Sequence, residues 1–228
     1  MSNPVIETKG LTKTYEGIVP VYAVRGADLT IEDNEFTAII GPSGSGKTTL
    51  LNMIGGLDRP TSGSIRVNGH ELTGLSESEL IDFRLKHIGF VFQSYNLIPV
   101  LTAKENAEFI MLLQDVPKTQ RDARVEQLLR EVGLADQMHK RPTQLSGGQQ
   151  QRVAVARALA SRPDFVLADE PTANLDSVSA TNLLDIMARL NQDEGITFIF
   201  STHDQRVIDR AKRVITLEDG VIVSDERR

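Results

Sequence analysis

Cysteine and tryptophan are both missing from this 228-residue sequence, and so are long apolar runs. The lack of cysteine excludes disulfides and thiolate metal sites, which fits a reducing compartment. No apolar run approaches the roughly 20 residues that a membrane-spanning helix requires. The first nine residues lack the basic and then apolar layout of a signal peptide. If this protein works at a membrane, we therefore expect a partner to hold it there.

Positive charge is also scarce. The sequence has 25 Lys and Arg residues against 31 Asp and Glu residues, a formal net charge of −6. Nucleic-acid binders usually present a basic field, so the composition argues against that class and we expect no nucleic-acid partner. Hydrophobic residues make up 40% and charged residues 25%, the balance of a soluble globular protein. The length suits one large domain, or a domain with a subdomain.

Residues 41–48, with the sequence GPSGSGKT, fit the P-loop pattern G-x-x-x-x-G-K-[ST]. They follow an apolar run at 36–40 and precede a segment at 49–54 that is expected to be helical. A strand-to-helix junction suits this loop, because the unpaired N–H groups and positive dipole end of the helix face the phosphates. Lys47 would neutralise charge on the β- and γ-phosphates, and the Thr48 hydroxyl would bind Mg²⁺. The segment therefore predicts a nucleotide site.

Two carboxylates, Asp169 and Glu170, follow the apolar run at 165–168. Carboxylates at the carboxyl end of such a strand lie in the crevice where open α/β sheets bind ligands. Phosphoryl transfer requires positioning, a metal and charge neutralisation more than covalent chemistry. With a P-loop upstream, we expect Asp169 to orient Mg²⁺ and Glu170 to act as general base on the attacking water.

The order of the patterns predicts an α/β fold. Residues 5–31 alternate as strands do, and apolar strands at 36–40, 88–92, 165–168 and 196–200 suit a parallel sheet covered on both faces. Residues 103–160 are mostly helical in pattern, and Ser146 with Gln149 has the spacing of a capping box. We expect a single domain over residues 1–228: a RecA-like P-loop NTPase core with an N-terminal antiparallel β subdomain and an inserted α-helical subdomain at about 94–160.

The pentapeptide LSGGQ at 145–149 occurs together with a P-loop in the ABC-type ATPases. The chain resembles the ATP-binding subunit of an ABC transporter over essentially its full length. The resemblance implies hydrolysis of ATP with Mg²⁺ and a homodimer in which Ser146, Gly147 and Gly148 of one protomer close on the ATP held by the other. A helix N-terminus with free donors and a favourable dipole suits that role.

The resemblance also gives roles to matches that are weak when taken singly. Tyr15 matches the aromatic side chain that stacks on adenine, and Gln93 matches a glutamine that senses Mg²⁺ and the attacking water. His203 matches the switch histidine that contacts the γ-phosphate, and residues 173–176 match the loop that reaches the partner protomer. The predicted catalytic residues are Lys47, Gln93, Glu170 and His203, and the predicted metal-binding residues are Thr48, Gln93 and Asp169. The predicted nucleotide-binding residues are Tyr15, Gly41, Ser43, Gly44, Ser45, Gly46, Lys47, Thr48, Thr49, Ser146, Gly147, Gly148 and Gln149.

Residues 56–63, 91–99 and 101–106 are similar to the LolD/MacB branch of the family. That similarity implies a cytoplasmic ATPase, peripheral on the cytoplasmic face of the inner or plasma membrane, which drives a separate permease with a large extracytoplasmic domain. An FtsE-like regulatory ATPase, which signals through a membrane partner without transporting a substrate, is the alternative. Soluble ABC ATPases that act on ribosomes or DNA usually carry tandem ATPase domains or long coiled-coil insertions, and this sequence has neither.

The sequence alone does not decide the role of two local features. Ala173 stands where this branch often has glycine, which is tolerable unless the position requires a positive φ. Residues 94–106 lie where the family receives its permease. Their apolar side chains are either a groove for a partner or part of the subdomain's own core. These side chains are Tyr95, Leu97, Ile98 and Leu101.

Overall fold

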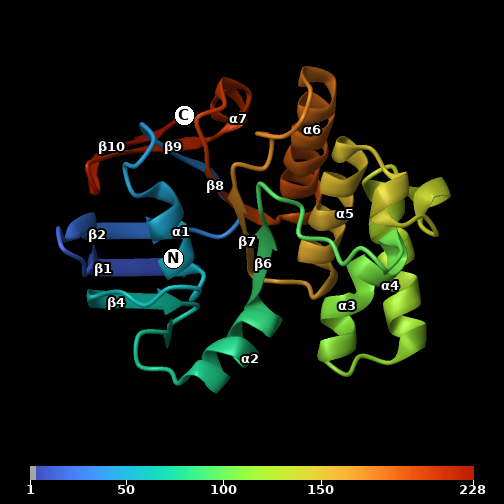
Figure 1. The fold of residues 1–228 in the computed structure, drawn as a ribbon, viewed down its shortest axis with the longest axis horizontal. Helices are drawn as coiled ribbons and strands as arrows, with labels where there is room; N and C mark the ends of the chain where they lie inside the picture. The colour runs from blue at the N-terminus through green and yellow to red at the C-terminus, as the bar shows by residue number, and fades with distance from the viewer. Residues whose placement is uncertain (1–3) are drawn as a thin grey trace.

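A six-stranded, mostly parallel sheet forms the centre of the computed structural model, which describes residues 4–228 (Figure 1). Its strands lie in the order β10-β9-β3-β8-β7-β6, with only the edge strand β10 antiparallel to its neighbour. Their bounds are β3 Phe36–Ile40, β6 Ile88–Val91, β7 Phe165–Asp169, β8 Thr197–Ser201, β9 Arg213–Glu218 and β10 Val221–Arg227. The strands expected from the apolar runs all lie in this sheet, and the carboxyl ends of β3, β6, β7 and β8 meet at one edge.

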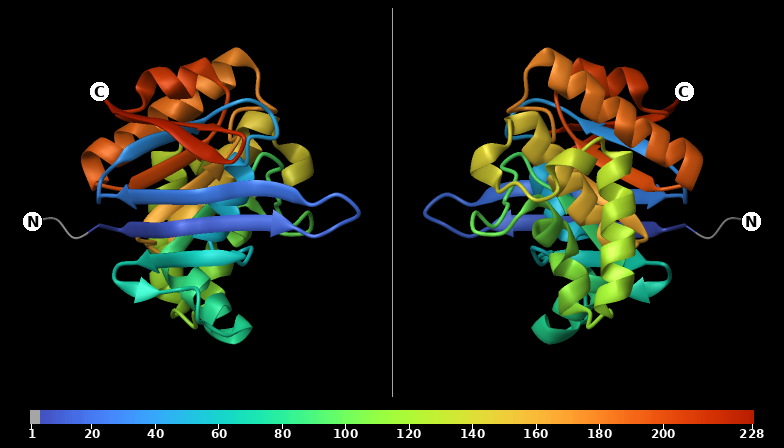
Figure 2. Two further views of the ribbon diagram at one scale, coloured as in Figure 1. Left: turned by 90° about the vertical axis from the view of Figure 1, so that its left-hand side faces the viewer. Right: turned by 90° about the vertical axis from the view of Figure 1, so that its right-hand side faces the viewer.

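A second, antiparallel sheet of order β2-β1-β4-β5 lies beside the first. Strands β1 (Ile6–Tyr15) and β2 (Val21–Ile31) form a long hairpin, and their connecting loop projects past β4 in Figure 2. Strands β4 (Ser62–Val67) and β5 (His70–Glu71) come after helix α1 (Lys47–Ile54). The antiparallel part is therefore not wholly N-terminal to the core, since the chain returns to it after the first helix.

Alternation along the parallel strands explains why they are apolar throughout. On β7, Phe165 and Leu167 pack into a core shared with α1 and the antiparallel sheet, whereas Val166 and Ala168 pack into a second core against the helices. Successive side chains of a strand point to opposite faces, so a sheet covered on both sides needs apolar residues at every position. Helix α1 lies between the two sheets (Figure 1).

The second face of the parallel sheet is covered by helices. Helices α3 and α4 stand together in the right-hand view of Figure 2. In Figure 1, α5 lies between them and the sheet, and α6 stands next to α5 towards the top of the view. Their bounds are α3 Ala103–Leu113, α4 Lys118–Glu131, α5 Gly147–Ala160 and α6 Ser177–Glu194. Short 3-10 turns at Ala135–Gln137 and Pro142–Gln144 join α4 to α5. The helical pattern predicted for 103–160 is thus present, in three helices and two turns.

Two helices were not anticipated from the sequence. Helix α2 (Glu77–His87) buries only Leu80, so it lacks the apolar periodicity that reveals a helix. Its capping box, in which Ser76 and Glu79 bond each other's backbone N–H groups, was the available signal. Helix α7 (Gln205–Arg210) has six residues and is too short for a periodic pattern. Within residues 4–228, no helix is both long enough and apolar enough to cross a membrane.

Candidate functional site

The carboxyl edge of the parallel sheet opens into a cavity of about 740 Å³. The P-loop follows β3, Gln93 follows β6, Glu170 follows β7 and His203 follows β8. Parallel α/β sheets bind their ligands at this edge. Of the residues predicted from the sequence, the structure places the following around the cavity: Tyr15, Ser43, Gly44, Gly46, Lys47, Thr48, Thr49, Gln93, Glu170 and His203.

The P-loop is held tightly against the strand ends behind it. A Cβ atom on Gly41 would lie 2.0 Å from the Leu217 carbonyl oxygen, and one on Gly46 would lie 2.1 Å from the Ala23 carbonyl oxygen. Both glycines also have positive φ, 149° and 100°, which side chains rarely allow. Glycine is therefore required at these two positions by space as well as by backbone conformation.

The loop and the start of α1 fit a phosphate group. Gly46, the N-cap of α1, gives no side-chain acceptor to the first N–H groups of the helix, which leaves them free for an anion. The Ser45 hydroxyl is buried beneath the loop and has no hydrogen-bond partner among residues 4–228. Lys47 is mostly buried, and its Nζ donates to the Gly41 and Pro42 carbonyls at 2.8 and 3.0 Å.

Hard oxygen donors lie side by side at the end of the P-loop. Thr48 Oγ1 donates to both carboxylate oxygens of Asp169, at 3.0 and 3.1 Å. Hydroxyl and carboxylate oxygens are the ligands that Mg²⁺ prefers, so the donor set fits that ion. Gln93 is exposed on the other side of the cavity, and its backbone carbonyl accepts a hydrogen bond from the Asn174 side chain at 3.0 Å.

Glu170 is held by the segment that follows β8. One carboxylate oxygen lies 2.7 Å from His203 Nδ1, and the other accepts from Thr202 Oγ1 at 3.2 Å. The backbone N–H of Glu170 donates to the Ser201 carbonyl. Glu170 has φ of 46°, an uncommon value for a residue with a side chain, and such strain concentrates at functional sites. His203 is 75% exposed at the cavity, whereas the Glu170 side chain is 17% exposed.

Tyr15 stands at the far end of the cavity, at the end of β1. Its hydroxyl donates to Asp58 Oδ2 at 2.7 Å, and Lys13 Nζ lies 4.9 Å from the centre of its ring. Burial raises the pKa of the phenol, so the hydroxyl stays protonated at neutral pH. The exposed fraction of Tyr15 is 41%, which leaves ring surface free for a flat ligand.

The LSGGQ segment lies elsewhere. Ser146 caps α5 through a complete capping box with Gln149, as the spacing predicted. A Cβ on Gly147 would lie 2.6 Å from the Tyr95 hydroxyl oxygen, and one on Gly148 would lie 2.8 Å from the Ser179 hydroxyl oxygen at the start of α6. None of residues 146–149 lines the cavity at the P-loop in the described part of the chain. Within one chain, the predicted site residues therefore form two groups that lie apart: one around the P-loop cavity and one at residues 146–149.

An apolar groove of about 690 Å³ runs between α2, β6, α3 and α5. Leu57, Ile81 and Leu113 line it with exposed fractions of 44%, 54% and 53%. For residues 94–106 the sequence left two alternatives open, a groove for a partner and the subdomain's own core, and each describes a different side chain. Ile98 lines this groove, whereas its neighbour Leu97 packs against the helical core.

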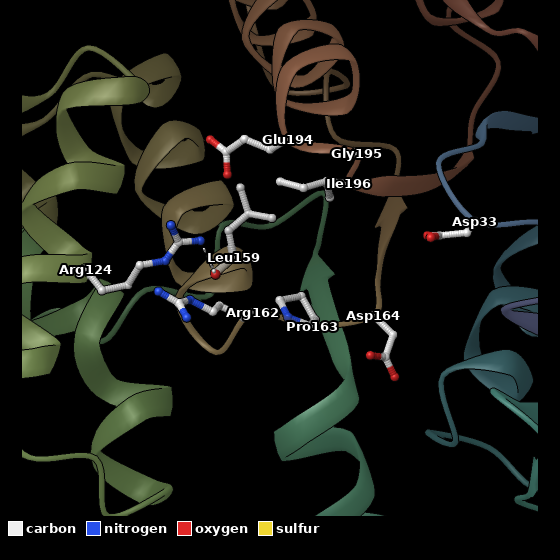
Figure 3. A pocket seen from close by; sticks show the side chains of 9 residues that line it. All are labelled: Asp33, Arg124, Leu159, Arg162, Pro163, Asp164, Glu194, Gly195 and Ile196. Carbon is white, nitrogen blue, oxygen red and sulfur yellow. Dashed lines mark hydrogen bonds between the residues drawn. The ribbon is translucent and has the colours of Figure 1, made fainter.

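A third cavity, of about 360 Å³, lies at the opposite edge of the sheet (Figure 3). Asp164 and Ile196, which line it, directly precede β7 and β8, so it faces the amino ends of the strands. The guanidinium groups of Arg124 and Arg162 lie near each other in Figure 3, and Arg124 Nη2 donates to the Leu159 carbonyl. None of the predicted site residues lines it within residues 4–228, so it is separate from the phosphate cavity.

Sequence reasoning missed several residues of the phosphate cavity. Arg25 and Tyr22 line it from β2, with the Arg25 guanidinium carbon 5.4 Å from the centre of the Tyr22 ring. Both lie within the stretch at 5–31 that was predicted to form strands, and no motif in the sequence marks them. Ala173 also lines the cavity and is not among the residues with positive φ. The alanine found in place of glycine is therefore accommodated without backbone strain.

Comparison with known proteins agrees with this geometry. Residues 24–173 match a protein family described as ABC transporter. The chain is 50% identical over 226 residues to the macrolide export ATP-binding/permease protein MacB of Rhodopseudomonas palustris, covering 99% of this chain but only 34% of that protein. It is 48% identical to the lipoprotein-releasing system ATP-binding protein LolD of Anaeromyxobacter dehalogenans, covering 99% of this chain and 95% of that protein.

A solved structure has the same fold. The dimeric ATP-binding cassette MJ0796, in a post-hydrolysis state bound to ADP and Pi, superimposes with a TM-score of 0.89 and 41% sequence identity. The superposition covers 97% of this chain and 98% of that one. The α/β fold class predicted from the sequence is confirmed. The division into a single domain with a helical insert at about 94–160 stays a prediction.

Proposed function

Because this chain belongs to the ABC transporter family and is an ATP-binding cassette of ATPase type, we propose that it is the motor subunit of a LolD/MacB-type complex. It dimerises around two ATP molecules and drives a separate membrane permease with a large extracytoplasmic domain. The complex places it on the cytoplasmic face of the membrane. The observation that carries the proposal is the cavity at the carboxyl ends of the parallel strands, where a P-loop, a carboxylate pair and a histidine converge.

Nucleotide binding begins at the P-loop. The free N–H groups at the start of α1 bind the phosphates, and Lys47 exchanges its bonds to two loop carbonyls for bonds to phosphate oxygens. Thr48 and Asp169 would hold Mg²⁺, Asp169 through water, and the ion would supply positive charge that neutralises the phosphates. Tyr15 stacks on adenine at the other end of the cavity.

Hydrolysis depends on Glu170 as the base that accepts a proton from the attacking water. His203 and Gln93 line the same cavity and position the γ-phosphate and the water. The contact between Glu170 and His203 Nδ1 orients both side chains before ATP arrives. Positioning of this kind, together with electrostatic stabilisation, supplies the rate enhancement in phosphoryl transfer.

Dimer formation completes the site. Ser146 and the N-terminus of α5 present donors on a surface that lies away from the chain's own cavity, which is where a second copy would need them. In the symmetric dimer, the LSGGQ segment of each protomer closes on the ATP bound at the partner's P-loop. The similarity to a cassette solved as a dimer supports this arrangement.

The permease docks in the apolar groove between α2, β6, α3 and α5. The groove presents exposed apolar side chains without covering partners, and such a patch is typical of an interaction site. Phe92, which lines it, directly precedes Gln93 at the phosphate cavity. A permease helix that displaces Phe92 in the groove would therefore also displace Gln93, the next residue, in the phosphate cavity.

The substitution Glu170→Gln tests the catalytic part of this proposal. It removes the base but keeps the size and polarity of the side chain, so we expect ATP binding to persist and turnover to fall at least about 100-fold. The variant should accumulate as an ATP-bound dimer, measured by size-exclusion chromatography with and without ATP. Wild-type turnover in this variant, or a monomer at saturating ATP, would contradict the base or the dimer respectively.

A further inference from the structure

Thr202 is a fully buried threonine, and its hydroxyl bonds the proposed catalytic base. Thr202 Oγ1 lies 3.2 Å from one carboxylate oxygen of Glu170, while His203 occupies the other oxygen. No motif in the sequence marks Thr202, because a threonine after an apolar strand carries no pattern of its own. Its contact with Glu170 spans 32 positions in the chain.

The direction of the Thr202 hydroxyl is fixed by its surroundings. Thr202 Oγ1 accepts a hydrogen bond from the Asp204 backbone N–H at 3.0 Å, so its own proton is free for the Glu170 carboxylate. The Thr202 backbone N–H donates to the Ile39 carbonyl on β3. Backbone hydrogen bonds therefore fix Thr202 on both sides, and one of them connects it to β3, the strand that leads into the P-loop.

Asp204 connects Thr202 to the segment that follows Glu170. Its carboxylate accepts from Thr172 Oγ1 at 2.6 Å and from the Arg206 guanidinium. The bonds from Arg206 hold the pKa of Asp204 at about 2, so the carboxylate is charged throughout the physiological range. Thr172 lies two residues after Glu170, and it is 1% exposed. The base is thus held from the β8 side at its carboxylate and, through Thr172, at its own loop.

We propose that Thr202 is a positioning residue for hydrolysis: its hydroxyl, aligned by Asp204, sets the direction of the Glu170 carboxylate towards the attacking water. The inference rests on the proposed role of Glu170 as base. The Glu170 carboxylate has two supports, and His203 is 75% exposed whereas Thr202 is fully buried, so Thr202 is the more tightly constrained of the two. A misdirected base costs rate without costing ATP affinity.

The chain offers a matched control at the other end of β8. Thr197 begins β8, is also fully buried, and its Oγ1 donates to a carboxylate oxygen of Asp33 at 3.2 Å. Its hydroxyl likewise accepts from a backbone N–H, that of Asn34 at 2.9 Å. The two threonines therefore share burial and bonding pattern at opposite ends of β8, but Thr197 lies at the amino edge of the sheet, away from the phosphate cavity.

The experiment compares Thr202→Val with Thr197→Val in steady-state ATPase assays and thermal unfolding. Valine keeps the shape of threonine and removes the hydroxyl. We expect both variants to lose similar thermal stability, but only Thr202→Val to lose kcat, by about tenfold or more with the KM for ATP changed less than about twofold. Thr202→Ser keeps the hydroxyl and should retain most of the parent kcat.

Three results would overturn the inference: a Thr202→Val kcat no lower than that of Thr197→Val, a Thr202→Ser variant as slow as Thr202→Val, or a rise in KM that accounts for the whole loss. If Thr202→Val does not fold, the pair Thr202→Ser and Thr202→Ala isolates the hydroxyl, and equal kcat values for that pair would contradict the role. Failure of the base assignment is distinguishable, because it would appear as retained turnover in Glu170→Gln.

Discussion

Tyr15 is held in place by its own protein before any nucleotide arrives. The phenol donates to Asp58 from the loop after α1, and Lys13 lies over the ring. Lys13 also pairs with Asp58, so the three side chains form one cluster. A stacking platform that is already oriented loses less side-chain entropy when it binds a base.

Substitution of Tyr15 separates the ring from its hydroxyl. We expect Tyr15→Ala to weaken ATP binding by about 1–3 kcal/mol, since base stacking on an aromatic ring has this size. Tyr15→Phe keeps the ring and loses only the bond to Asp58, so its affinity should stay close to that of the parent. Isothermal titration with ATP measures both. Equal affinities for Tyr15→Ala and the parent would return this residue to a packing role.

At the residue scale, local patterns in the sequence are enough to propose candidate site residues but not the side chains that contact them. Lys47, Thr48, Asp169 and Glu170 belong to local patterns whose spacing is enough to recognise them. The contact of Tyr15 with Asp58 spans 43 positions, and no local pattern encodes it. Such contacts are made by the topology, which a single sequence does not display.

At the scale of helices and strands, the apolar groove beside α2 is the proposed docking site for the permease. Ile81 on α2 and Val223 on β10 have the same exposed fraction, 54%, but only Ile81 lines the groove. We expect Ile81→Asp to reduce binding of the permease and permease-stimulated turnover, while basal ATPase and the melting temperature change little. Val223→Asp is the matched control and should leave all four quantities unchanged. Normal permease binding by Ile81→Asp would remove the docking site from this groove.

Leu97 behaves differently in the same test because it packs against the helical core. A charge at Leu97 is expected to lower the melting temperature, since burying an unpaired charge costs several kcal/mol. The segment containing Leu97 and Ile98 has no regular secondary structure, so neither helical nor strand periodicity assigns its side chains to a face. This is why the sequence left both alternatives open. Helix α4, by contrast, buries Val125, Leu128 and Leu129 at helical spacing and lies in the stretch predicted to be helical.

A buried ion-pair cluster connects the N-terminal part of the chain to strands β9 and β10. Arg213 on β9 is 6% exposed, pairs with Glu35 before β3, and forms a two-bond contact with Asp225 on β10. The hydrogen bonds that Arg213 donates to Asp225, together with those it donates to Glu35, raise the pKa of Arg213 despite its burial. Arg213 also donates to the Thr30 carbonyl on β2, so the cluster bridges both sheets.

Removing the centre of this cluster should destabilise the whole fold. We expect Arg213→Ala to lower the free energy of unfolding by about 3–5 kcal/mol, because Glu35 keeps a mostly buried charge without its main partner. Asp225→Asn should cost less, since the Asp225 side chain is 40% exposed and Arg213 retains Glu35. Urea denaturation of the two variants measures the difference. Equal losses would indicate that Asp225, and not Glu35, dominates the cluster.

Strand order is the feature of the whole molecule that the sequence could not supply. Apolar runs predicted that β3, β7 and β8 exist and are covered on both faces, but not that β3 lies between β8 and β9. Nor did any pattern indicate that β4 and β5 return to the antiparallel sheet after α1. Such pairings join distant parts of the chain, and local periodicity contains no information about them.

The position of β3 also governs when this protein can first bind its ligand. Phe36 on β3 pairs with Phe198 on β8, and Ile39 pairs with Ile215 on β9, so the ribosome makes both neighbours of the P-loop strand long after the P-loop strand itself. A ribosome spends on the order of ten seconds or more on the intervening residues. Throughout that interval the nascent chain has an unseated P-loop and open strand edges, and such exposed surfaces are bound by chaperones. Nucleotide can therefore stabilise the finished protein but cannot guide its early folding.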